Sequence, residues 1–145
     1  VMTTMQVDLV SSEEQIFSGE AEFLIAPGSE GEIGIYPRHI PLISKLNPGV
    51  VRVKLPQKEM HLVYVISGGY LEIQGNKVTV LADVVERTDD LDEAKLLEEK
   101  RIAEERLKRS DVSMDVDDVK AYAALELIIA QLKAVDYLNK QSRRS

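Results

Sequence analysis

The sequence predicts an α+β protein, in which a turn-rich β module is followed by a helical hairpin. All 13 glycines and prolines lie at or before Gly75, and the last 70 of the 145 residues contain none. Glycine and proline mark turns and interrupt regular structure, so residues 3–87 are expected to form strands and residues 88–145 almost uninterrupted helix. The apolar period also changes from two to three and four near this point. We therefore expect two domains, 1–87 and 88–145.

Apolar and polar residues alternate in several segments of the first domain, as in strands with one buried face. The alternation is clear over Met5–Leu9, Ala21–Ile25 and Val51–Leu55. Met60–Ile66 is apolar at nearly every position, which predicts a central strand covered on both faces. Gly75-Asn76 is typical of a two-residue hairpin turn. Many short strands with frequent turns favour a β sandwich or a barrel, and the residues alone leave these two open.

Two helices are expected in the second domain. Thr88–Asp90 offers N-cap residues for a helix from about Leu91 to Lys108. A polar connection over 110–115, with Ser113 or Asp115 as a cap, leads to a second helix over about 116–139. The second helix carries a seam with spacings of four and three, formed by Ala121, Leu125, Ile128, Leu132 and Val135. Its apolar arc is widened by Val119, Tyr122, Leu127, Ile129 and Leu138. A two-helix hairpin cannot bury so wide a surface alone, so part of it should meet the β module or a partner chain.

Composition excludes several classes of function. The chain has no cysteine, which rules out disulfides, thiolate metal sites and thiol catalysis. The net charge is -7 and neither half is basic, so nucleic-acid binding is not expected. No apolar stretch is long enough to span a membrane, and no apolar leader opens the chain, so a soluble or peripheral protein is expected.

No motif makes a credible active site, and we expect no cofactor and no metal. The glycines of Gly28–Gly34 have the wrong spacing for a dinucleotide or phosphate loop and favour a structural turn. His39 is more easily explained as a structural or interface residue than as a catalytic one, because the only other histidine lies in a predicted strand. The aspartates of 111–117 lack the glycine and the glutamate of a calcium loop. Ser67 is not flanked by the glycines of a nucleophile elbow.

One segment carries a specific resemblance. The run from Gly28 to Ile43, GSEGEIGIYPRHIPLI, closely resembles the signature loop of the epsilon subunit of bacterial F-type ATP synthases. Further matches follow in order along almost the whole chain, namely Ile16–Gly19, Asn47–Gly49, Ser67–Glu72, Val78–Asp83 and Leu91–Ala94. The resemblance implies a ten-stranded β sandwich followed by an antiparallel two-helix hairpin, without catalytic residues of its own.

The resemblance also implies a function. Such a subunit belongs to the rotor of the central stalk and joins the gamma subunit to the ring of c subunits, which couples proton flow to ATP synthesis. It is peripheral to the cytoplasmic face of the bacterial inner membrane. By the family pattern, a loop over residues 30–39 would face the c ring and the base of gamma. Its expected contact residues are Glu30, Glu32, Tyr36, Arg38 and His39.

In bacterial members the helical hairpin resembles a regulator, which folds against the sandwich or extends along gamma into the alpha and beta subunits and blocks ATP hydrolysis. If the free energies of the folded and extended positions differ by about a few kcal/mol, ligands can shift the population of molecules from one position to the other. The expected hinge is Arg87–Asp90. The basic residues that could face an acidic segment of beta are Arg101, Arg106, Lys108, Arg109, Lys140, Arg143 and Arg144.

Some members bind ATP through a motif of Ile or Leu followed by Asp-x-x-Arg-Ala. The corresponding run here begins with Leu91 and Asp92, but Lys95 replaces the arginine and a leucine replaces the alanine. Leu127 and Gln131 stand where ATP-binding relatives tend to carry arginines. Because lysine lacks the planar fork of arginine, we expect weak or absent ATP binding.

Two other functions stay open from the residues. A free-standing ligand sensor whose hairpin opens on binding would need converging polar groups, which the sequence does not reveal. A stand-alone enzyme would need a nucleophile with a base, or a metal cluster.

Overall fold

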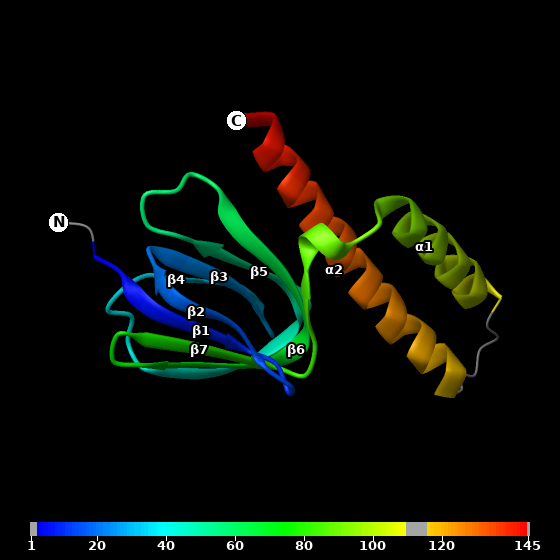
Figure 1. Cartoon of the computed structure of the whole chain (residues 1–145). Helices are drawn as coiled ribbons and strands as arrows, with labels where there is room; N and C mark the ends of the chain where they lie inside the picture. Colours follow the sequence, from blue (N-terminus) through cyan, green and yellow to red (C-terminus); the bar gives the residue numbers. More distant parts are fainter. Residues whose placement is uncertain (1–2, 110–115, 145) are drawn as a thin grey trace.

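The computed structural model describes residues 3–109 and 116–144 (Figure 1). The strands are β1 (Met5–Val10), β2 (Gln15–Ala21), β3 (Phe23–Gly28), β4 (Gly31–Ile35), β5 (Leu42–Lys54), β6 (His61–Gln74), β7 (Lys77–Ala82) and β8 (Val85–Arg87). They are followed by the 3-10 helix η1 (Thr88–Asp90) and the α-helices α1 (Glu93–Lys108) and α2 (Val116–Arg144). The strands therefore precede the helices, as expected for an α+β fold.

The strands form a β sandwich. Hydrogen bonding connects them in the order β2-β1-β7-β6-β5-β3-β4, with β8 beside β6, and among the pairs formed by described residues only β1–β7 is parallel. The first layer contains β2, β1, β7, the second half of β6 and the first half of β5. The second layer contains β4, β3, the second half of β5, the first half of β6 and β8. Side chains from both layers meet in one apolar core, for example Leu9 and Leu71 from the first layer and Leu24 and Ile66 from the second.

The expected number of ten strands is wrong, because the described residues form eight. The difference arises in β5 and β6, which have 13 and 14 residues and run without a break from one layer to the other. Each of these strands contributes one segment to each layer, so the layers hold five segments each. The sandwich class is as expected.

Both long strands change layers at residues that permit a bend. In β5 the change occurs at Asn47-Pro48-Gly49, and in β6 at Gly68-Gly69. A Cβ atom on Gly69 would lie only 1.8 Å from the carbonyl oxygen of Leu81, so β7 crosses this point too closely for any side chain. Glycine is therefore required here by the approach of a neighbouring backbone.

Two local expectations are confirmed, the first of them for Val63–Ile66 only, because Met60 lies before β6 and is 43% exposed. In β6, Val63–Ile66 is buried at four successive positions because Val63 and Val65 contact α2 while Tyr64 and Ile66 contact the sandwich core. The β6–β7 connection is a two-residue turn in which Gln74 pairs with Lys77 and Gly75 has a φ of 61°. Such a positive φ is the reason for glycine at this turn.

The helices form an arm, defined as the described residues from Thr88 to Arg144, that is folded against the second layer. Figure 1 shows α2 leaning across one side of the sandwich, with α1 on the far side of α2 from the strands. Leu127, Ala130 and Ala134 of α2 pack against valines of β5 and β6. The predicted seam of α2 instead faces α1, because Ile128, Leu132 and Val135 pack with Leu96.

Helix α1 begins two residues later than expected. Leu91 has an extended backbone and packs with residues of α2, so it cannot belong to the helix. The N-cap is Asp92, whose carboxylate accepts a hydrogen bond from the backbone N–H of Lys95. The connection over 110–115 and its predicted caps lie outside the described residues, as do the aspartates considered as a calcium loop up to Asp115.

Candidate interaction surfaces

The first candidate surface is the foot loop, defined as residues 36–41 between β4 and β5. Tyr36 is 61% exposed and Ile40 is 74% exposed. Arg38 has a left-handed φ of 67°, and its backbone N–H donates to Oδ1 of Asn76 in the β6–β7 turn. The imidazole Nδ1 of His39 lies 2.7 Å from the carbonyl oxygen of Ile40, so this nitrogen carries the proton and donates. The loop therefore has a defined shape and presents apolar and basic side chains together.

The structure separates the five predicted contact residues into two groups. The expectation of one continuous loop over residues 30–39 is wrong, because β4 occupies Gly31–Ile35 and pairs with β3. Glu32 is thus four positions before Tyr36 in nearly extended chain, a separation of about 13 Å. Glu30 lies at the β3–β4 turn, and the carboxylate of Glu32 lies 3.9 Å from Nζ of Lys133 in α2. Glu32 is therefore beside the arm, and the foot loop keeps Tyr36, Arg38 and His39.

The second candidate surface is the outer sheet face, formed by side chains of the first layer that point away from the core. Its members are Val10, Ile43, Lys45, Tyr70 and Leu81. Register places Lys45, Tyr70, Leu81 and Val10 in one row across four strands. Ile43, Tyr70 and Leu81 are exposed by 77%, 57% and 46% of their area. This surface was not expected from the sequence, although large apolar residues at outward strand positions are a readable signal.

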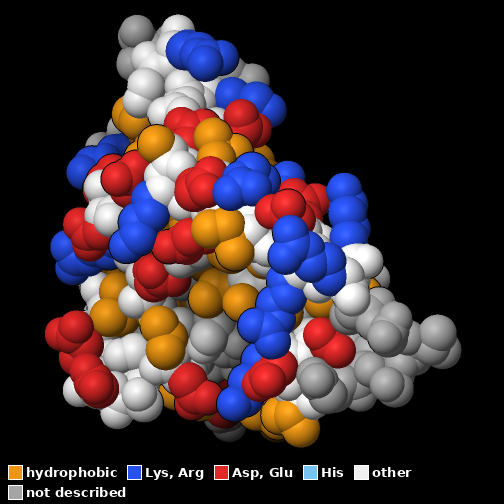
Figure 2. Space-filling view, turned by 90° about the vertical axis from the view of Figure 1, so that its right-hand side faces the viewer, with side chains coloured by type: hydrophobic (Ala, Val, Ile, Leu, Met, Phe, Trp, Pro, Cys, Tyr) orange, Lys and Arg blue, Asp and Glu red, His pale blue; other side chains and the backbone are white. Residues whose placement is uncertain are grey.

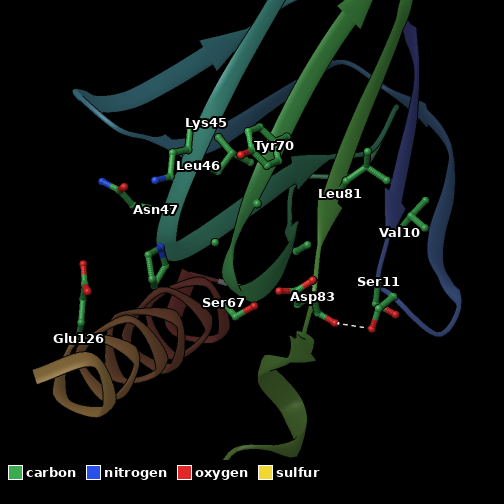
Figure 3. Close-up of a pocket in the computed structure, with 15 residues that line it drawn as sticks. Val10, Ser11, Lys45, Leu46, Asn47, Ser67, Tyr70, Leu81, Asp83 and Glu126 are labelled. Atoms are coloured by element: carbon green, nitrogen blue, oxygen red, sulfur yellow. Dashed lines mark hydrogen bonds between the residues drawn. The ribbon is translucent and has the colours of Figure 1, made fainter. Parts of the chain in front are cut away.

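A groove of about 570 Å³ adjoins the outer sheet face. Figure 3 shows Lys45, Tyr70 and Leu81 on the strands above it and Glu126 on α2 across from them. Gly68 and Gly69, where β6 changes layers, also line it. On its other side, the hydroxyl of Ser12 donates to the carbonyl oxygen of Asp83 and fixes the β1–β2 turn. The groove is therefore shaped by the sandwich and by the arm.

The third candidate surface is the interface that holds the arm on the sandwich. Besides its small apolar cluster, it contains several polar contacts. The side-chain amide of Gln141 accepts from the backbone N–H of His61 and donates to the carbonyl oxygen of the same residue, as a neighbouring strand would. The amide of Gln131 donates to the carboxylate of Glu86 at 2.9 Å. The guanidinium of Arg52 lies 4.2 Å from the centre of the Tyr137 ring.

The proposed hinge is partly fixed in this folded state. The hydroxyl of Thr88 is buried and donates to the carbonyl oxygen of Val63 at 2.7 Å. The exposed Asp89 and Asp90 follow at once. A bend of the chain after Thr88 would keep the buried Thr88–Val63 hydrogen bond, whereas a bend before Thr88 would break it.

The basic residues of the arm lie on a surface of mixed charge. Figure 2 shows Lys and Arg side chains next to Asp and Glu side chains over the helices, with apolar side chains between them. Arg101 is paired with Glu98 and Glu105, and this contact raises the pKa of Arg101 above its ordinary value. Arg109 also pairs with Glu105, and Arg106 lies 3.8 Å from Asp117.

Three further predicted arm residues lie at helix ends. Lys108 ends α1 and makes no ion pair within the described residues. Arg143 and Arg144 end α2, and the side chain of Arg143 is exposed. Lys108 and Arg143 are therefore more accessible to an acidic partner than Arg101, which would first have to give up its ion pairs with Glu98 and Glu105.

The residues of the segment that resembles an ATP motif cap and pack the helices. Asp92 caps α1, Leu91 packs between the helices, and the side chain of Lys95 is exposed. Leu127 packs against the sandwich, and the side-chain amide of Gln131 is hydrogen-bonded to the carboxylate of Glu86. These five residues therefore leave no set of converging cations for a triphosphate.

Neither a metal site nor a membrane-spanning helix is found in the part of the chain that the structure describes. No three His, Asp or Glu side chains there come together as metal ligands. Neither α-helix has the length and hydropathy needed to cross a bilayer, within residues 93–108 and 116–144.

Comparison with known proteins gives a consistent result. Residues 4–88 match the family described as ATP synthase, Delta/Epsilon chain, beta-sandwich domain. A protein named ATP synthase epsilon chain from Chromobacterium violaceum is 49% identical over 141 residues, which cover 97% of this chain and 99% of that protein. A protein of the same name from Nitrosospira multiformis is 51% identical over 140 residues, with the same coverage of each chain.

A solved structure agrees in fold. A chain in the cryo-EM structure of the Euglena gracilis mitochondrial ATP synthase superposes with a TM-score of 0.81. The aligned region covers 91% of this chain and 81% of that chain, at 21% identity. At this identity the match supports the shared sandwich-and-helices architecture.

Proposed function

Because this chain belongs to the ATP synthase delta/epsilon chain family, we propose that it is a non-catalytic rotor subunit in the central stalk of a bacterial F-type ATP synthase. The observation that carries the proposal is the near-full-length identity with bacterial epsilon chains. The subunit would couple proton flow to ATP synthesis, and it would be peripheral to the cytoplasmic face of the inner membrane through the complex. Its partners would be gamma, the c ring, and the alpha and beta subunits of the catalytic head.

The sandwich would be the part that anchors the subunit. The foot loop would meet the c ring, because it presents Tyr36, Arg38 and His39 together at one end of the molecule. The outer sheet face would bind gamma, because Ile43, Tyr70 and Leu81 expose apolar surface that a protein interface would cover. Glu30 and Glu32 would contribute at the edge formed by β4.

The arm would regulate the enzyme by changing its position. It is folded against the sandwich here, through a small apolar cluster and a few polar contacts. In the extended position it would lie along gamma and reach the catalytic head. There Lys108, Arg109 and the basic residues at the end of α2 would face acidic groups, and rotation in the hydrolysis direction would be blocked.

Deletion of the arm tests this division of roles. A variant that lacks residues 89–145 should assemble and retain coupling, while its ATP hydrolysis should rise because nothing can block rotation. The measurement is ATP hydrolysis and ATP-driven proton pumping in the reconstituted enzyme. Failure of the truncated sandwich to join the complex, although it is folded by circular dichroism, would contradict the anchor role.

A point substitution tests the arm without removing it. Ala134 is fully buried between α2 and the strands, so Ala134→Glu should release the arm and favour the extended, inhibitory position. The matched control is Ala124→Glu, on the exposed face of the same helix. Hydrolysis should fall in the first variant and stay unchanged in the second. Equal hydrolysis in both variants, with the arm shown to be released, would exclude the regulatory role.

Co-purification separates this proposal from a free-standing ligand sensor. A tagged full-length chain should bring down gamma from cells that express the complex. Substitution of Tyr70 and Leu81 by serine should reduce this recovery if the outer sheet face is the gamma surface. Recovery of the chain alone would favour the sensor.

A further inference from the structure

A cavity of about 480 Å³ lies where the end of α2 meets the sandwich. Its walls come from both domains. Arg52 of β5 and His61 of β6 form one side, and Tyr137, Lys140 and Gln141 of α2 form the other. The cavity is therefore complete only while the arm is folded.

Arg52 is the unusual group in this cavity. No carboxylate within the described residues lies at ion-pair distance from it, whereas the neighbouring Lys54 is paired with Glu22 at 3.1 Å. Its Nε atom is buried and has no hydrogen-bond partner among the described atoms. Its guanidinium is held in place by the face of the Tyr137 ring. Buried polar atoms are normally satisfied, so an unsatisfied Nε in a fixed guanidinium points to a missing acceptor.

Among the residues that line the cavity, cations outnumber carboxylates. Arg52 and Lys140 line it, and the one carboxylate among the lining residues is that of Glu59. Lys140 is paired with the exposed Asp136 at 3.0 Å, outside the lining, so Arg52 is the lining cation without an ion-pair partner among the described residues. Lys133, whose Nζ lies 3.9 Å from the carboxylate of Glu32, is 5.8 Å from the Tyr137 ring. Burial, together with the charges of Arg52 and Lys54, lowers the pKa of His61, as expected in a positive field.

We propose that this cavity binds a phosphate group, with oxygens that accept hydrogen bonds from the guanidinium of Arg52 and the ammonium of Lys140. Arginine presents a planar fork that matches the oxygens of phosphate, and a pre-positioned fork loses little freedom on binding. The site shares no residue with the Leu91–Leu96 segment and does not require its missing arginine. Because both domains form its walls, a bound phosphate group stabilises the folded position of the arm.

Titration of the ¹⁵N-labelled full-length chain with sodium phosphate tests the site. The Nε–H resonance of Arg52 should shift and saturate, while sodium chloride of equal ionic strength should not shift it in this way. Arg52→Gln should weaken binding, followed through the backbone amides of His61 and Gln141, by roughly tenfold or more. The matched control is Lys58→Gln, an exposed cation in the β5–β6 connection that does not line the cavity, and it should bind phosphate like the unmodified chain.

A second variant keeps the proposal testable if Arg52→Gln fails to fold. Glu59 is the one carboxylate that lines the cavity, where its charge opposes the binding of an anion, and it is exposed, so its substitution should not disturb folding. Glu59→Gln should therefore tighten phosphate binding by about two- to tenfold. Unchanged or weaker binding in Glu59→Gln would overturn the proposal, as would phosphate shifts that chloride reproduces.

Competition with ATP distinguishes a nucleotide from inorganic phosphate as the source of the phosphate group. Displacement of phosphate by ATP, lost in Arg52→Gln, assigns the site to nucleotide phosphates, whereas no displacement assigns it to inorganic phosphate. Displacement that persists in Arg52→Gln would contradict the assignment of the ligand to this cavity. Hydrogen exchange supplies the readout of arm docking, because phosphate should slow exchange of the Tyr137–Gln141 amides.

Discussion

The sandwich and the arm are held together by different kinds of contact. In the sandwich, large aliphatic side chains such as Leu9, Leu24 and Ile66 are fully removed from solvent and meet in one core. Where the arm touches the sandwich, the buried apolar residues of α2 are Ala130 and Ala134, packed against valines. Alanine buries little apolar area, so each such contact contributes much less than a leucine in the core.

The difference teaches how one chain can contain a fixed part and a detachable part. The remaining arm contacts are made by the half-buried Leu127 and Tyr137, by hydrogen bonds and by a cation–π pair. Water can replace the polar contacts when the arm leaves. Helix α1 buries one residue, Leu96, and packs on α2 rather than on the strands. The arm can therefore leave the sandwich as a unit without exposing the core of either part.

The largest effect is expected inside the sandwich. Gly69→Ala would place a Cβ atom against the carbonyl oxygen of Leu81, so β6 and β7 could not keep their pairing. We expect a loss of more than about 3 kcal/mol in the free energy of unfolding, measured by urea denaturation. Gly34→Ala is the matched control, because its nearest neighbour would be 4.0 Å away, and it should unfold like the unmodified chain. Normal stability in Gly69→Ala would mean that the crossing is looser than described.

A smaller and local effect is expected in the arm. Leu96→Ala removes the buried contact of α1 with Ile128 and Val135 and should cost the helical hairpin about 2–4 kcal/mol. Hydrogen exchange should accelerate in α1 while the β6 amides keep their protection. The neighbouring Leu97 is 52% exposed, so Leu97→Ala should change little. Equal loss of protection in the strands would show that the arm and the sandwich unfold as one unit.

The arm contact should also depend on pH through His61. Burial, then the charges of Arg52 and Lys54, hold the pKa of its imidazole below the ordinary value of 6.5. The unfolded chain thus binds the proton more readily, so the stabilisation is complete above about pH 6.5 and is lost as the pH falls through the folded-state pKa. Melting temperatures measured at about pH 7.5 and about pH 5.5 should differ more in the unmodified chain than in His61→Gln. If the melting temperature changes equally with pH in both proteins, His61 is not the cause of the pH dependence.

The smallest effect is expected at the segment that resembles an ATP motif. Lys95 is exposed and its side chain contributes to no cationic cluster, so Lys95→Ala should leave any ATP binding by the isolated subunit unchanged. Calorimetric titration of both proteins measures this. Saturable binding at millimolar ATP or below that disappears in Lys95→Ala would show that lysine replaces the family's arginine after all.

The broad architecture could be predicted because its signals are local. Loss of glycine and proline after Gly75 and a change of apolar period identify strands and helices without knowledge of contacts. The strand number could not be obtained in this way, because a bend at Gly68-Gly69 looks like a turn in sequence but interrupts no pairing in β5 and β6. The start of α1 was misplaced for a related reason, since Leu91 is held by tertiary packing against α2.

The candidate surfaces were predicted less well than the fold. Glu32 and His39 were expected in one loop, but Glu32 lies in β4 and His39 follows that strand, and a glycine-rich segment gives little sign of a strand. The contacts of Arg52 with Tyr137 and of His61 with Gln141 join residues 80 or more positions apart, so no local pattern reveals them. The separate roles of residues 1–87 and 88–145 stay a prediction.

The continuity of β5 and β6 has a mechanical consequence. A sandwich made of two separate sheets can yield when one sheet slides over the other, because only side chains resist the movement. Here two strands cross from one sheet to the other as unbroken polypeptide, so sliding would have to stretch covalent backbone and shear the ladder between them. A twisting load applied at the outer sheet face would therefore reach the layer beneath α2 with little elastic loss, which suits a body that turns as one piece.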